Sequence, residues 1–137
     1  MRSDKILGYI TGSELPFGVR VSQRIQNSLI REYCESRGYV YLLSDTEYLA
    51  SSDWLVLRSI PNNGGSWDGL CLYSIFQLPD DLELRIGIVK RFFEREQKLH
   101  FALEGVCAAN LREFAYVNHI WEIRKSSITW LPNGLRR

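Results

Sequence analysis

The chain has 137 residues, of which 45% are hydrophobic and 24% are charged, and its formal net charge at pH 7 is +1. This length predicts a single domain with one core, and the composition excludes disordered, collagen-like and coiled-coil proteins. The near-neutral charge argues against a surface dominated by nucleic-acid contacts.

Apolar runs and apolar stripes alternate along the chain, which predicts strands that alternate with helices. The strands are short, nearly continuous apolar runs, and the helices show apolar residues spaced by three and four. Gly12, Gly38 and Pro61 interrupt this pattern and end individual elements. In chain order we expect a strand at 5–11, a helix with an apolar stripe at 21–34, a strand at 39–43, a short helix at 54–60, a strand at 68–75, a helix with a stripe at 84–93, a strand at 99–103 and a helix with a stripe at 111–121.

Side chains at the element ends give further local predictions. Ser44 and Glu47 have the spacing of a capping box, which predicts a helix start directly after the second strand. A second possible start of the short helix is at residues 51–53, which read Ser-Ser-Asp. On the third helix, we expect Arg85 to lie largely outside the apolar stripe. We expect residues 1–137 to form one α/β domain, with a core at about 5–122 and a C-terminal tail at 123–137.

This alternation is typical of a parallel sheet covered by helices on both faces. Four strands joined by right-handed crossovers are most simply ordered 2-1-3-4, in a three-layer α/β/α sandwich. That order places a switch point between the first and third strands, where a crevice opens at the carboxyl ends of the strands. We expect residues 11–20 and 74–79 to line this crevice.

Several short motifs occur in one order between about residues 6 and 105. Among them are Gly8-Tyr9-Ile10, Phe17-Gly18-x-Arg20, Gln23-x-x-Gln26-Asn27, Tyr73-Ser74-x-Phe76-x-Leu78-Pro79 and Ala102-Leu103-Glu104-Gly105. In these motifs the chain resembles the sporadic carbohydrate cluster protein family. Members of that family are encoded among genes for surface-polysaccharide and nucleotide-sugar synthesis. The resemblance therefore implies a role in carbohydrate biosynthesis, without implying a particular reaction.

The first half also resembles, more distantly, the catalytic domain of serine recombinases. Their Tyr-x-Arg-x-Ser segment corresponds to Tyr9 through Ser13, with Thr11 in place of the arginine. Their Asp-Arg-Leu-x-Arg segment corresponds to residues 76–80, which keep only Leu78. Without those arginines no evident group stabilises charge during phosphoryl transfer. This resemblance implies a flavodoxin-like or resolvase-like fold, and it does not imply recombinase activity.

The candidate site residues lie where predicted strands end. Arg20 stands between a glycine-containing loop and a helix start, where a guanidinium can bind a phosphate or carboxylate. Glu104 ends the fourth strand and is the candidate acid/base, and Ser13 is a candidate nucleophile with no histidine or lysine base near it in sequence. The remaining candidate substrate-binding residues are Gly12, Gln23, Ser44, Glu47, Ser74 and Gln77.

Several candidates also have an ordinary structural explanation. Ser13, Ser44 and Glu47 belong to residue types that cap helices or close turns. Arg20 suits an exposed surface position, and Glu104 suits a hydrogen-bonded structural carboxylate. The sequence leaves these alternatives open.

Cysteine and histidine spacing gives no support for a metal or cofactor site. Cys34, Cys71 and Cys107 lie in apolar contexts without zinc-like spacing, so we expect buried free thiols in a reducing compartment. His100 and His119 have no metal-ligand partner at suitable spacing. No apolar run approaches the roughly 20 residues that span a bilayer, and the N-terminal apolar run is too short for a signal peptide. We therefore expect a soluble, cytoplasmic protein without a membrane partner.

Three hypotheses of function follow, and whether the protein is catalytic stays open among them. The leading one is a protein of carbohydrate biosynthesis, most simply an enzyme, that binds a sugar phosphate or nucleotide sugar. The second is a non-catalytic subunit that binds a sugar-modifying partner through the tryptophan-bearing segment 121–131. The third, least favoured, is a degenerate recombinase-like protein that binds nucleic acid. A homodimer is a further expectation, because a small sheet often completes its burial by dimerising.

Overall fold

The structure is a computed structural model, and the residues that it describes are 3–15, 20–47, 54–63 and 65–129. Apolar runs form the strands, and apolar stripes form the helices that pack on them. Within these residues the elements are β1 (Lys5–Thr11), α1 (Gln23–Ser36), β2 (Val40–Glu47), α2 (Leu55–Ser59), the 3-10 turn η2 (Ile60–Asn62), β3 (Gly69–Leu72), the 3-10 turn η3 (Ile75–Gln77), α3 (Leu82–Glu94), β4 (Lys98–Phe101), β5 (Val106–Ala108) and α4 (Leu111–Thr129).

The described strands form one sheet in the order β2-β1-β3-β4-β5. Neighbours from β2 to β4 are parallel, in the order that the sequence predicts, and β5 pairs with β4 in the antiparallel direction. The prediction of a four-stranded, wholly parallel sheet is therefore wrong, whereas the α/β class is confirmed. The chain reverses after β4 through Gly105, whose φ of +68° is a conformation that glycine adopts readily. A three-residue strand after such a turn leaves almost no periodic signal in the sequence.

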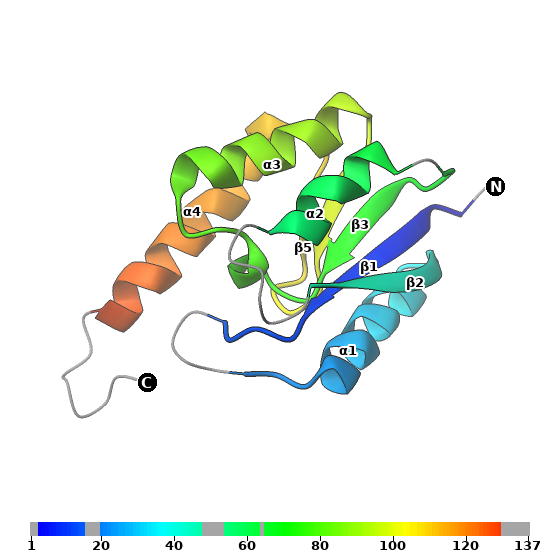
Figure 1. Cartoon of the computed structure of the whole chain (residues 1–137), viewed down its shortest axis with the longest axis horizontal. Coiled ribbons are helices and arrows are strands. Elements are labelled where there is room, and N and C mark those ends of the chain that lie inside the picture. The colour runs from blue at the N-terminus through cyan, green and yellow to red at the C-terminus, as the bar shows by residue number, and fades with distance from the viewer. Residues whose placement is uncertain (1–2, 16–19, 48–53, 64, 130–137) are drawn as a thin grey trace.

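Helices cover both faces of the sheet (Figure 1). On one face, α1 packs against β1 and β3 through a cluster that includes Ile6, Ile30 and Cys34. On the other face, residues of α2, α3 and α4 join the larger apolar cluster, which contains Leu57, Phe92 and Trp121. The molecule thus has the three layers that the sequence predicts, with the carboxyl ends of the parallel strands meeting at one edge.

Helix ends follow the chemistry of their capping residues. The Ser22 hydroxyl accepts a hydrogen bond from the Ile25 amide at the start of α1, and Gly38 follows the helix with a φ of +73°. Asp81 caps α3 in the same way, and the side chain of Asn110 accepts from the Glu113 amide at the start of α4. These caps fix where each helix begins relative to the strand before it.

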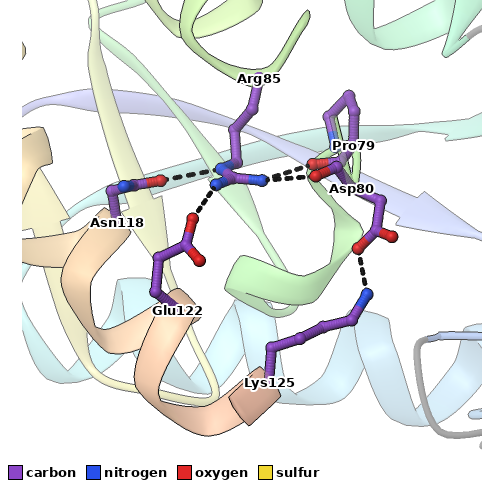
Figure 2. Close-up of polar contacts among 6 residues, drawn as sticks. All are labelled: Pro79, Asp80, Arg85, Asn118, Glu122 and Lys125. Atoms are coloured by element: carbon purple, nitrogen blue, oxygen red, sulfur yellow. Dashed lines mark hydrogen bonds and ion pairs between the residues drawn. The ribbon is translucent and has the colours of Figure 1, made fainter. Parts of the chain in front are cut away.

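Several local predictions are wrong. Ser44 through Glu47 continue β2 and do not start a helix. Arg85 is fully buried on α3, where it joins α4 through the polar contacts of Figure 2. Cys107 is exposed, although Cys34 and Cys71 are buried as predicted. Helix α4 continues to Thr129, well past the predicted end of the core at 122.

Candidate functional site

The turn after β3 is closed by a reciprocal pair of side chains. The Ser74 hydroxyl accepts from the Phe76 amide at 3.1 Å, and Oε1 of Gln77 accepts from the Ser74 amide at 3.2 Å. Both side chains are buried. This capping box satisfies backbone donors at the start of η3, so it explains why polar residues occupy an otherwise apolar segment.

Glu104 lies in the turn between β4 and β5 and reaches to the turn after β3. Its Oε2 accepts from the Ser74 hydroxyl at 2.7 Å, and its Oε1 accepts from the Ile75 amide at 3.0 Å. Burial raises the pKa of Glu104, and these two hydrogen bonds oppose that shift because they stabilise the charged form. A half-buried carboxyl with a raised pKa is well suited to accept or donate a proton.

Gln26 extends the polar contacts from β3 to β1. Its Oε1 accepts from the Thr11 amide at 2.9 Å and from Nε2 of Gln77 at 3.0 Å. Its Nε2 donates to the carbonyls of Thr11 and Val21. We call Glu104, Ser74, Gln77, Gln26 and Thr11 the carboxyl-edge network, because it joins the carboxyl ends of β4, β3 and β1 to α1.

Gln26 belongs to this network but was not among the substrate-binding residues predicted from the sequence. It lies four residues before Ile30 and seven before Tyr33, both buried, so it occupies the buried stripe of α1. A polar residue at such a position needs hydrogen-bond partners inside the protein. That combination is the signal by which the sequence could have revealed it.

Glu47 serves a neighbouring structural role. Its carboxylate is buried and accepts from the Tyr9 hydroxyl at 2.8 Å and from the amides of Val56 and Leu57. Glu47 therefore caps α2 from the end of β2. The sequence predicted instead that Glu47 would cap a helix starting at Ser44. Burial, together with the adjacent Glu47 carboxylate, raises the pKa of Tyr9.

Ser44 lies apart from the carboxyl-edge network. It pairs with Gly8 within the β1–β2 ladder, and its hydroxyl donates to Oδ1 of Asn27 on α1 at 2.7 Å. The same hydroxyl lies 2.6 Å from the hydroxyl of Tyr41. These contacts join β2 to α1, so the structure does not bring Ser44 together with Ser74 and Glu104.

The segment after β1 holds the other predicted site residues. Gly12 donates its amide to the Glu47 carbonyl at 2.9 Å, and the Ser13 amide donates to the Thr11 hydroxyl at 3.1 Å. The Arg20 side chain is 57% exposed, and its guanidinium lies 3.7 Å from a carboxylate oxygen of Glu14. Residues 16–19 of the predicted crevice lining lie outside the described residues.

Gln23, the last predicted substrate-binding residue, is exposed in the first turn of α1. Among the predicted residues, side-chain hydrogen bonds join Ser74 to Gln77 and to Glu104, whereas Gly12 and Glu47 meet through their backbone groups. Among the described residues, no group of three or more His, Cys, Asp and Glu side chains is placed to hold a metal ion. The described helices include none with the length and apolar character needed to cross a membrane.

Fold and site together define an α/β protein with a polar network at the carboxyl edge of its parallel strands. Comparisons with protein-family models, curated proteins and solved structures found no match.

Proposed function

We propose that this protein binds a phosphorylated or acidic sugar at the carboxyl edge between β1 and β3, and that it is a cytoplasmic enzyme of carbohydrate biosynthesis with a flavodoxin-like or resolvase-like fold. The observation that carries the proposal is the contact between Glu104 and Ser74. It holds a half-buried carboxyl, whose pKa is raised by burial, at the edge where open α/β sheets bind ligands. The resemblance in sequence supports the choice of a sugar.

In this proposal some side chains contact the ligand, and others orient those side chains. The hydroxyl of Ser74 both donates to Glu104 and accepts from a backbone amide, and the amide group of Gln77 is hydrogen-bonded at both ends. Their part in the proposal is to orient Glu104. The Glu104 carboxylate would accept a proton from a sugar hydroxyl, or donate one when it is protonated.

Arg20 is the proposed anion-binding group. Its guanidinium is 57% exposed and lies 3.7 Å from Glu14, beyond the length of a charge-assisted hydrogen bond. A phosphate could replace this weak exposed pair with two parallel hydrogen bonds. Arg20 lies shortly before the first turn of α1, where free amides also favour an anion.

Calorimetric titration with a sugar 1-phosphate and a uridine diphosphate sugar tests this placement. Arg20→Ala should weaken binding by about tenfold or more, because it removes a charge-assisted pair. Arg112→Ala, an exposed arginine in the first turn of α4, is the matched control and should leave affinity unchanged. No binding of either probe, or equal affinity of the two variants, would reject the proposal.

The pH dependence of binding tests the role of Glu104. An ionised Glu104 repels an anionic ligand, so affinity for the diphosphate sugar should fall as pH rises through the raised pKa of this carboxyl. The diphosphate diester does not titrate in that range, and the Glu104→Gln variant should therefore bind it with little pH dependence. A variant that keeps the full pH dependence would remove Glu104 from the site.

A second candidate function is a non-catalytic subunit that docks on a sugar-modifying enzyme. Trp121, within the segment first expected to bind a partner, is buried in the core, and Trp130 lies outside the described residues. On helix α4 the exposed fraction is 65% for Tyr116 and 51% for Ile123. These residues are seven positions apart, which places them on the same side of the helix. Copurification with a sugar-modifying enzyme that survives Arg20→Ala and fails for Tyr116→Ser with Ile123→Ser would favour this function.

A further inference from the structure

A second concave site lies between α2 and α3, away from the carboxyl-edge network. It is a groove of about 500 Å³, within the size range of small-molecule sites. Leu55, Arg58 and Pro61 line it from α2 and η2, and Leu84, Gly87 and Arg91 line it from α3. These helices cover the same face of the sheet (Figure 1).

Gly87 is the residue that the fold itself does not explain. It lies in the interior of α3, where glycine costs about 1 kcal/mol relative to alanine. A Cβ atom built on it meets no atom within 4 Å, so no packing contact within the described chain requires glycine there. The missing side chain leaves the α3 backbone open to the groove, which allows a ligand to approach it closely.

Apolar side chains and two arginines, Arg58 and Arg91, line the groove. Ile88 is buried beneath the groove, and Arg91 donates to Oδ1 of Asn62, which joins the C-terminal part of α3 to η2. Glu83, the acidic residue of the lining, lies eight residues before Arg91 and therefore about 12 Å away along the helix. Arg58 lines the same groove from the opposite helix.

We propose that this groove binds a small organic anion, with a phosphate or carboxylate beside Arg58 and Arg91 and an apolar body over Gly87. Guanidinium groups favour these anions through paired hydrogen bonds. The adjacent Leu84 and Pro61 side chains would cover the apolar part of the ligand. This site is separate from Arg20 and Glu104, so it stands or falls independently of the function proposed for the carboxyl edge.

Titration of the isotopically labelled full chain with phenyl phosphate, followed by amide NMR, tests the site. The amides of Gly87 and Ile88 should shift, with a dissociation constant of about 1 mM or below for so small a ligand. Inorganic phosphate, which has no apolar body, should bind at least about tenfold more weakly. The Arg112→Ala variant, whose exposed arginine lies outside both sites, should show the same shifts at Gly87 and Ile88 as the unchanged protein.

Two variants make the outcome decisive. In Gly87→Leu the new side chain starts in open space and occupies the groove, and leucine favours a helix more than glycine does. This variant should therefore fold, which urea unfolding can verify, and it should lose binding of phenyl phosphate. Arg91→Gln keeps a polar side chain near Asn62 and should weaken binding by about tenfold. Absence of shifts at Gly87 and Ile88, equal binding of inorganic phosphate, or unchanged binding by Gly87→Leu would overturn the proposal.

Discussion

The buried guanidinium of Arg85 donates to Oε1 of Glu122 at 2.8 Å, although the Glu122 side chain is 51% exposed. It also donates from Nε to Oδ1 of Asn118 at 2.8 Å (Figure 2). The guanidinium carbon lies 4.0 Å from the centroid of the Trp121 ring. Burial lowers the pKa of Arg85, and the Glu122 carboxylate opposes that shift. One arginine of α3 thus contacts two successive turns of α4.

The same guanidinium fixes the segment that follows η3. Its Nη1 donates to the carbonyls of Pro79 at 2.9 Å and Asp80 at 3.1 Å, and the Asp80 carboxylate pairs with Lys125 of α4. This segment directly follows the turn that carries Ser74 and Gln77. Arg85 therefore links the segment that follows η3 to α4.

Replacement of Arg85 by methionine should lower the free energy of unfolding by about 2–4 kcal/mol, because it leaves buried carbonyl groups without donors. Urea unfolding monitored by circular dichroism measures this loss. Glu122→Gln is the matched control: it keeps an acceptor oxygen at a half-exposed position and should cost less than about 1 kcal/mol. Equal losses in the two variants would show that the ion pair, and not the carbonyl contacts, carries the stabilisation.

Most of the secondary structure could be predicted from the sequence because its signals are local. Apolar runs marked β1 and β3, and apolar stripes marked α1 and α3. The antiparallel strand β5 was missed because three residues after a turn carry too little periodicity to distinguish a strand from a loop. The continuation of β2 through Ser44 was missed because the capping-box spacing was satisfied there by chance, whereas Glu47 caps a later helix.

The candidate site was predictable where parallel strands end and unpredictable where polar groups are buried on helices. Ser74 and Glu104 meet because the carboxyl ends of β3 and β4 lie side by side. The sequence predicts Arg85 largely outside the apolar stripe of α3, although it lies three, four and seven residues before the buried Ile88, Val89 and Phe92. A charged residue at an inward position is therefore a signal of a buried polar cluster that hydrophobic patterning alone overlooks.

His100 makes the stability of the fold sensitive to acid. Its Nδ1 lies 2.8 Å from the Tyr33 hydroxyl, its buried Nε2 has no hydrogen-bond partner among the described residues, and burial lowers its pKa from 6.5 to about 4. Protonation therefore favours the unfolded chain. The neutral imidazole of His100 makes its full contribution to the free energy of unfolding above pH 6.5, and this contribution is lost progressively as pH falls toward 4.

The expected loss is about 3 kcal/mol between these limits, since one pKa unit corresponds to about 1.4 kcal/mol. Urea unfolding at a series of pH values measures it. The His100→Asn variant keeps an acceptor for Tyr33 without a titrating ring, so its unfolding free energy should fall less steeply over the same range. If both proteins lose stability in parallel, carboxylates elsewhere cause the acid sensitivity.

Gly8 is required by the close approach of β1 to Ser44. A Cβ atom on Gly8 would lie 2.1 Å from the Ser44 hydroxyl and 3.2 Å from Cε1 of Tyr41. Gly8→Ala should therefore lower the free energy of unfolding by about 1–3 kcal/mol. In the double variant with Ser44→Ala the nearest clash is absent, so thermal or urea unfolding should show a loss smaller than the sum of the single changes. Simple additivity would contradict this account.

The pKa of Glu104 gives a direct measure of its contact with Ser74. Burial raises this pKa, and the Ser74 hydroxyl lowers it, so Ser74→Ala should raise it further. Because the pKa of Glu104 is higher in the folded protein than in the unfolded chain, the protonated carboxyl stabilises the fold. This stabilisation is present below the ordinary pKa of glutamate and is lost as pH rises through the raised pKa. Carbon-13 NMR titration of the Glu104 carboxyl measures this pKa in the unchanged protein and in the Ser74→Ala variant. Ser36→Ala, whose hydroxyl bonds the Tyr33 carbonyl, should leave the midpoint unchanged. A Ser74→Ala midpoint at or below that of the unchanged protein would mean that Ser74 does not stabilise the charged carboxylate.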